Sequence, residues 1–141
     1  MTYVSHEHYS GRYADELSGR SRVMISATHN DTRAMIRILL EMWGYDVIEA
    51  DGKAETVELA KNEHPGLILL DTTQRFADEV KVASDIRSSD SLSSIPIIVM
   101  SARSPLLKRS ALEHGATGHL VKPIDLDLLQ GCLDKCLDEV H

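Results

Sequence analysis

The sequence lacks the features of a membrane protein or a nucleic-acid-binding protein. No uninterrupted apolar segment approaches the ~18 residues that a membrane span requires, and the N-terminus has no apolar core of a signal peptide. Lysine and arginine number 15 against 22 aspartates and glutamates, and the resulting net charge of -7 argues against binding to a phosphate backbone. We therefore expect a cytoplasmic protein whose partners are neither nucleic acid nor membrane.

Cysteine is also scarce. Cys132 and Cys136 lie four residues apart in a helical pattern, a spacing that matches no zinc or redox motif and predicts packed thiols.

With 141 residues the chain is long enough for one domain with its own core. Residues 1–20 are mostly polar without sustained periodicity, so we expect a flexible N-terminal arm followed by a single domain over residues 21–141.

Short apolar runs alternate with helical patterns along that domain. The predicted strands are RVMIS, YDVIEA, LILLD, IPIIVM and GHLV, at residues 22–26, 45–50, 67–71, 95–100 and 118–121. Such continuous apolar runs are typical of strands that are buried on both faces of a parallel sheet. Five strands that alternate with five helices predict a doubly wound α/β domain with a parallel sheet and helices on both faces.

The helical patterns predict particular faces and ends. After the first strand, apolar side chains recur at i, i+3, i+4 and i+7 and predict the inward face of a helix: Met35, Ile38, Leu39 and Met42. We expect Asp78 to cap the helix after the third strand. Ser104 followed by Pro105 is typical of the first residues of another helix.

Polar residues collect where the predicted strands end. The third strand ends at Asp71, and the other strand ends carry Ala27, Thr28, Ser101 and Lys122. The crevice beyond the carboxyl ends of parallel strands is where open α/β folds place their chemistry. A carboxylate can accept a phosphoryl group as a nucleophile, a lysine can neutralise the added charge, and a hydroxyl can bond a phosphoryl oxygen. The alternative is a structural Lys–Asp ion pair with an unrelated serine.

From Arg22 to about Asp138, the sequence resembles the receiver domain of two-component response regulators. The landmarks are LILLD ending at Asp71, PIIVMSA carrying Ser101, and HGATGHLVKP carrying Lys122-Pro123. The resemblance implies a flavodoxin-like five-stranded parallel sheet of order 2-1-3-4-5. It also implies that Asp71 is the phosphoacceptor and that the chain functions in phosphorelay signalling.

The resemblance assigns further roles residue by residue. Ser101 would be the switch hydroxyl and Lys122 the phosphate-sensing cation. His119 falls where the family usually has an aromatic switch residue, and the peptide bond before Pro123 would be cis. The implied metal ligands that remain are the Asp71 carboxylate and the Thr73 backbone carbonyl.

The sequence departs from the family at the end of the first strand. Receivers carry two adjacent acidic residues there that help to hold Mg²⁺, and this chain has Ala27 and Thr28. Because Mg²⁺ prefers carboxylate and water oxygens, we expect weak Mg²⁺ binding and slow phosphoryl transfer. Arg75 stands where the following loop usually has proline, and Glu79 where it usually has glycine, so we expect that loop to be shaped differently.

Two functional hypotheses remain open. In the first, the chain is a stand-alone receiver that takes phosphate on Asp71 from a histidine kinase or phosphotransfer protein and acts through another signalling protein. In the second, it is a pseudo-receiver, a protein-interaction module that works without phosphorylation. We expect no enzyme and no small-molecule substrate. A phosphatase or dehalogenase wants a second carboxylate where Thr73 stands, and Ser26 to Asp31 contains no glycine for a dinucleotide phosphate turn.

Overall fold

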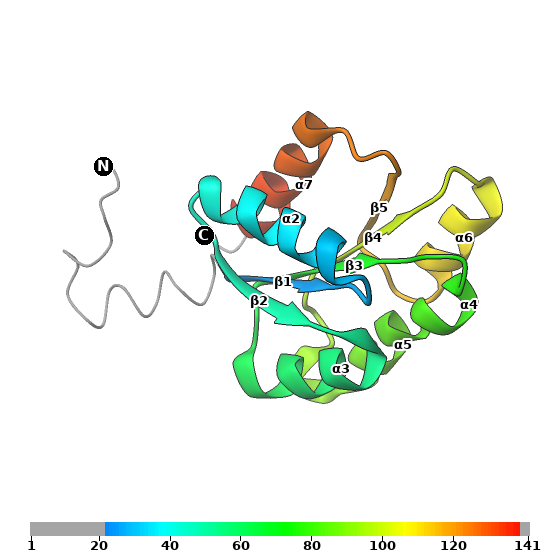
Figure 1. Cartoon of the computed structure of the whole chain (residues 1–141). Helices are drawn as coiled ribbons and strands as arrows, with labels where there is room; N and C mark the ends of the chain where they lie inside the picture. Colours follow the sequence, from blue (N-terminus) through cyan, green and yellow to red (C-terminus); the bar gives the residue numbers. More distant parts are fainter. Residues whose placement is uncertain (1–21, 139–141) are drawn as a thin grey trace.

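The computed structural model describes residues 22–138, which form a parallel five-stranded sheet in the order β2-β1-β3-β4-β5 (Figure 1). The sheet confirms the predicted architecture and strand order. The predicted N-terminal arm lies outside the described residues. The strands are β1 (Arg22–Ser26), β2 (Asp46–Ala50), β3 (Leu67–Asp71), β4 (Ile97–Ser101) and β5 (Gly118–Val121).

The helices cover both faces of the sheet (Figure 1). Side chains of α2 and α7 share one apolar cluster, and side chains of α3 to α6 share another on the opposite face. None of the helices within residues 22–138 is long and apolar enough to cross a membrane. The helices are α2 (Asn30–Met42), α3 (Gly52–Glu63), α4 (Phe76–Glu79), α5 (Lys81–Arg87), α6 (Pro105–Glu113) and α7 (Leu126–Asp138), with a 3-10 turn at Asp90–Leu92.

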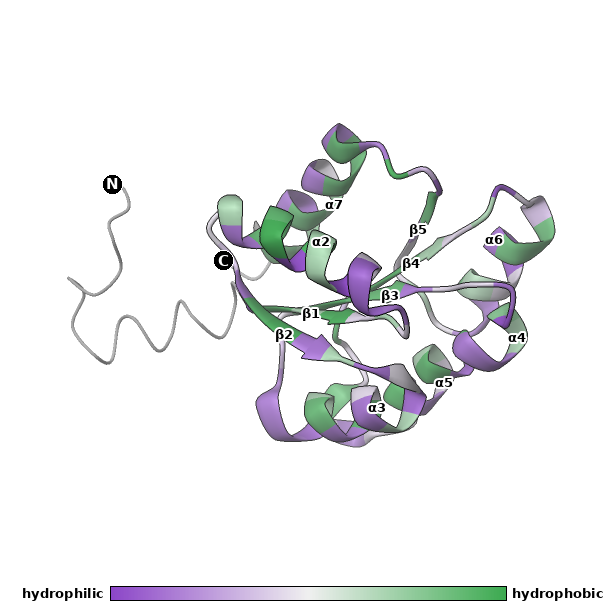
Figure 2. Ribbon diagram, viewed as in Figure 1, coloured by the Kyte–Doolittle hydropathy of each residue, from purple (hydrophilic) through white to green (hydrophobic). Residues whose placement is uncertain are grey.

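The central strand β3 and its neighbour β4 lie in the core of the molecule. Every residue of β3 and β4 is buried, as expected of strands covered on both faces, and Figure 2 shows hydrophobic colouring along the central strands. Each buried aliphatic side chain contributes about 1.5–3 kcal/mol relative to its exposed state. Because β3 is fixed by neighbours on both edges and both faces, the position of its last residue is strongly determined.

The predicted inward face of α2 is wrong for three of its four residues, whereas Leu39 packs partly buried against the core. Met35, Ile38 and Met42 are 65%, 51% and 76% exposed, whereas Ile36 and Leu40 are buried against the sheet. The helix carries two overlapping apolar stripes, and the periodicity alone did not distinguish them. The stripe through Ile36 and Leu40 packs against the sheet, and Arg33 and Arg37 on α2 pair with Glu49 of β2.

The helix ends agree with the sequence in one case and differ in another. Ser104 caps α6, and its hydroxyl oxygen accepts a hydrogen bond from the backbone N–H of Leu107, as predicted. After β3, however, the chain enters α4 at Phe76, so Asp78 lies inside the helix and does not cap it. Phe76 is buried in the core, and this contact starts the helix earlier than the polar sequence suggested.

Candidate functional site

Asp71 is the last residue of β3 and is almost completely buried at the carboxyl edge of the sheet, with 4% of its surface exposed. Lys122, which directly follows β5, places its Nζ atom 2.5 Å from Asp71 Oδ1. The same ammonium donates a hydrogen bond of 2.7 Å to the Thr72 backbone carbonyl. Within residues 22–138, Asp71 Oδ1 has no hydrogen bond of good geometry, and Lys122 contacts it as an ion pair.

Burial and the neighbouring charges act in opposite directions on the titration of Asp71. Burial raises the pKa of the Asp71 carboxyl above its ordinary value, and this effect outweighs the lowering that contact with Lys122 produces. The negative charge of Glu79 raises the pKa further, and His29 lowers it. The structure therefore brings together the carboxylate and the lysine that the sequence singled out, inside a poorly solvated site.

Ser101 and His119 form a second contact at this edge. The Ser101 hydroxyl, at the end of β4, lies 2.6 Å from Nε2 of His119 on β5 and 2.9 Å from the Ala102 carbonyl. Because the carbonyl can only accept, both contacts are satisfied when the hydroxyl donates to it and His119 donates from Nε2. Burial, followed by the charge of Lys108, lowers the pKa of His119, which favours the neutral imidazole.

The backbone fixes the lysine relative to the serine. The N–H of Lys122 donates to the Ser101 carbonyl at 2.8 Å, which continues the β4–β5 ladder by one residue. The following Lys122–Pro123 peptide bond is cis. Asp71, Ser101 and Lys122 are therefore linked at this edge, through the Asp71–Lys122 ion pair and the backbone hydrogen bond from Lys122 to Ser101.

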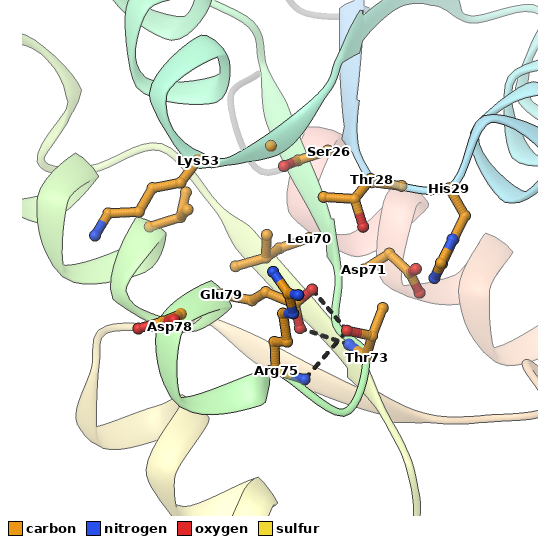
Figure 3. A pocket seen from close by; sticks show the side chains of 13 residues that line it. Ser26, Thr28, His29, Lys53, Leu70, Asp71, Thr73, Arg75, Asp78 and Glu79 are labelled. Carbon is orange, nitrogen blue, oxygen red and sulfur yellow. Dashed lines mark hydrogen bonds between the residues drawn. The ribbon is translucent and has the colours of Figure 1, made fainter.

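A pocket of about 380 Å³ opens in front of Asp71 (Figure 3). Of the other residues predicted for the site, Ala27, Thr28 and Thr73 line it, with Ala27 buried and Thr28 exposed. Figure 3 shows His29 beside Asp71 at one end of this pocket. The remaining charged residues of its lining are Lys53, Arg75, Asp78 and Glu79.

Few of these groups are suitable ligands for a hard divalent cation. The end of β1 offers no carboxylate, and the Ala27 carbonyl already accepts a 2.7 Å hydrogen bond from the Arg33 guanidinium. Asp71 is paired with Lys122. Among residues 22–138, no group of three or more acidic, histidine or cysteine side chains is arranged to hold a metal ion. The residues present do not fit a Mg²⁺ site built on carboxylates.

The sequence did not predict two of the charged residues that line the pocket, Lys53 and Glu79. Lys53, at the start of α3, reaches the pocket from the carboxyl end of β2, and its only sequence signal is that position. Glu79 was noticed only as a departure from the family, although its carboxylate binds both the backbone N–H and the hydroxyl of Thr73 (Figure 3). A carboxylate in place of a loop glycine is the signal that indicated it.

Comparison with known proteins agrees with this geometry. The family model described as the response regulator receiver domain matches residues 23–134. The transcriptional regulatory protein ZraR of Escherichia coli strain K12 is 31% identical over 108 residues, which cover 76% of this chain and 24% of that protein. The chain spans between about a quarter and a half of the length of the first curated relatives that it matches.

Solved structures share the fold. The signal receiver domain of a histidine kinase from Syntrophus aciditrophicus superposes with a TM-score of 0.77 at 22% identity, covering 85% of this chain and 92% of that chain. The receiver domain of the sensor histidine kinase PA1611 from Pseudomonas aeruginosa PAO1 has a TM-score of 0.75 at 22% identity, covering 84% and 98%. That second structure holds a magnesium ion in its active-site cleft.

Proposed function

Because this chain belongs to the response regulator receiver domain family of two-component signalling, we propose that Asp71 is its phosphoacceptor. The observation that carries the proposal is the position of Asp71. It is a buried carboxylate at the carboxyl end of β3, paired with Lys122 and facing a pocket. The donor is a phosphohistidine of a histidine kinase or a phosphotransfer protein, and the reader is another signalling protein.

The proposed step transfers a phosphoryl group from nitrogen to oxygen. An oxygen of Asp71 forms the new P–O bond while the P–N bond to the donor imidazole breaks, and the nitrogen keeps the bonding pair. The product is an acyl phosphate with more negative charge than the carboxylate. Lys122 is close enough to neutralise part of that charge. Ser101 would hydrogen-bond a phosphoryl oxygen only after losing its contact with His119 or Ala102. Phosphorylation would therefore change the contacts between β4 and β5.

We propose that the change is read on the surface of α6, β5 and α7. Residues 102–107 connect Ser101 to the start of α6, where Leu106 is 71% exposed. His119 lies on β5 directly beside this segment. A rearrangement at Ser101 therefore alters an apolar surface that a partner protein can bind.

A phosphorylation-independent interaction module is the second candidate. The observation that favours it is the missing pair of carboxylates at Ala27 and Thr28. Without them, Mg²⁺ binding should be weak, and the charge of the transferring group loses a stabilising cation. In this case Asp71 and Lys122 form a structural ion pair, and partner binding depends only on the fold.

The deciding experiment is intact-mass spectrometry after incubation with phosphoramidate, with and without Mg²⁺, on the wild-type protein and Asp71→Asn. A phosphoryl adduct that is absent from Asp71→Asn supports the phosphoacceptor proposal, whether or not it depends on Mg²⁺. Absence of any adduct from a folded wild-type sample overturns it and favours the interaction module. Circular dichroism of both proteins checks that they are folded.

A further inference from the structure

The loop that follows Asp71 is closed by a carboxylate. Oε1 of Glu79 accepts a 2.6 Å hydrogen bond from the backbone N–H of Thr73, and Oε2 accepts one of 2.9 Å from the Thr73 hydroxyl (Figure 3). The Thr73 hydroxyl oxygen in turn accepts a hydrogen bond from the N–H of Arg75 at 3.2 Å. Glu79 is the last residue of α4, so its side chain connects the end of this short helix to Thr73 in the loop.

This contact uses the donors that an anion in front of Asp71 would need. Thr73 lies two residues after Asp71 and lines the same pocket, and a backbone N–H in such a loop is a good anion donor. The N–H of Thr72 is already bonded to the Met100 carbonyl, and Lys122 is bonded to the Thr72 carbonyl. An incoming anion therefore has to displace the Glu79 carboxylate to gain the Thr73 N–H.

The charge of Glu79 acts in the same direction. Its carboxylate raises the pKa of Asp71, which shows that negative charge on Glu79 opposes negative charge at Asp71. A phosphoryl group on Asp71 adds negative charge at this place. Asp71, Asp78 and Glu79 line the pocket, and of these Asp71 is paired with Lys122. The ammonium of Lys53 lies 3.9 Å from the carboxylate of Asp85.

We propose that Glu79 is an internal competitor for the anion-binding position of this pocket. Its carboxylate occupies the Thr73 N–H in the resting protein, and a phosphate-like tetrahedral anion binds only when that contact opens. The proposal deepens the proposed function, because it names the residue that restricts the phosphoryl group at Asp71. Glu79 acts through Thr73 and through its charge, so it is a positioning residue.

The test measures non-covalent anion binding, so that it does not depend on phosphorylation of Asp71. The background is Asp71→Asn, which cannot form an acyl phosphate and removes one repelling charge. Inorganic phosphate is titrated into this variant and into the double variants with Glu79→Ala, Glu79→Gln and Asp78→Asn. Backbone amide shifts followed by NMR give the dissociation constants. Asp78→Asn is the matched control, because Asp78 lines the same pocket and carries the same charge, while its carboxylate contacts Lys81.

We expect Glu79→Ala to tighten phosphate binding about tenfold, the effect of freeing one charge-assisted donor. Glu79→Gln should give a smaller gain, because its amide oxygen can still accept from Thr73. Asp78→Asn should change the dissociation constant less than about twofold. The Thr73 amide signal should shift on phosphate addition in both Glu79 variants. If Glu79→Ala fails to fold, Glu79→Gln alone decides between a gain and no gain.

Equal effects of Glu79→Ala and Asp78→Asn would overturn the proposal, because they would reduce it to a general charge effect. No gain in either Glu79 variant would also overturn it. The outcome is separate from the proposed function. A gain in the Glu79 variants, together with a wild-type protein that phosphoramidate does not modify, would support the competitor role and reject Asp71 as phosphoacceptor.

Discussion

The two halves of the carboxyl edge of the sheet differ in which groups they bring into contact. In the half formed by β3, β4 and β5, Asp71 meets Lys122, and Ser101 meets His119, through contacts of 2.5 Å and 2.6 Å. In the half formed by the end of β1 and the loop after β3, Ala27 and Thr28 supply no charge. The carboxylate of that half, Glu79, is bonded to the loop itself.

The difference concerns two properties of the pocket, the binding of an anionic group and the binding of a metal ion. The β3–β5 half contains the residues that we propose receive a phosphoryl group and transmit its effect, Asp71, Lys122 and Ser101. The β1 half has neither the acidic side chains that hold a hard cation nor a free donor at Thr73. The two halves contain different residues, so each can be changed separately by mutation.

The largest effect is expected from restoring acidic residues to the β1 half. In Ala27→Asp/Thr28→Asp, both new carboxylates would face the pocket beside Asp71. We expect the Mg²⁺-dependent rate of modification by phosphoramidate to rise on the order of 10²-fold, since a bound cation supplies several kcal/mol of charge stabilisation. Intact-mass time courses at several Mg²⁺ concentrations measure the rate. The control is Ala27→Asn/Thr28→Asn, because asparagine has the shape of aspartate without its charge. An equal rise in the rate of that variant would contradict the prediction.

The second prediction concerns the stability of the β3–β5 half. Burial raises the pKa of Asp71, so the native state holds its proton at pH values where the unfolded chain, with a pKa of about 3.9, has lost it. Stability from this group is therefore present at low pH and is lost as pH rises through the native pKa. Asp71→Asn does not ionise, so it should be more stable than the wild type at neutral pH, with a difference that shrinks on acidification.

Urea unfolding over a pH series measures this difference. Lys122 loses its partner in the variant, but its side chain is 35% exposed and keeps the Thr72 carbonyl, so its hydration limits the cost. Asp78→Asn, at an exposed position, serves as the control for a general charge effect. A less stable Asp71→Asn protein at neutral pH would show that the Lys122 pairing outweighs burial.

The smallest effect is expected at Ser101. Ser101→Ala removes the partner of His119 in a buried position and should destabilise the protein by about 1 kcal/mol. Thr28→Ala, in the β1 half and exposed, should change stability by less than about 0.5 kcal/mol. Denaturant unfolding of both variants compares the halves directly. Equal losses would mean that the Ser101 contact contributes nothing beyond an ordinary surface hydroxyl.

Much of the fold was predictable because its signals are local. The apolar runs that form β3 and β4 are continuous and end at polar residues, and Ser104-Pro105 marks a helix start without reference to any distant residue. Asp71 was found in the same way, as the residue that ends a buried strand. Parallel strands bring the ends that carry Asp71 and Lys122 to one edge, so the alternation of strands and helices predicted that they could converge, and the structure shows that they touch.

Other features depended on partners that are distant in sequence or on a choice between equal patterns. The two apolar stripes of α2 have the same period, and only packing on the sheet and the ion pairs with β2 decided that Met35, Ile38 and Met42 face outward. The early start of α4 depended on burial of Phe76. The contact between Ser101 and His119 joins two strands, and no local pattern contains its geometry.

The sequence by itself determined the order of elements, the buried strands and the residue types available at their ends, because each of these depends on neighbouring residues. The tertiary structure decided how those residues are used. In the packed chain Glu79 bonds Thr73, Lys122 pairs with a buried carboxylate, and Ile36 and Leu40 form the inner face of α2. Those outcomes depend on distances between segments and on the loss of water around charges, which arise only when the chain has packed.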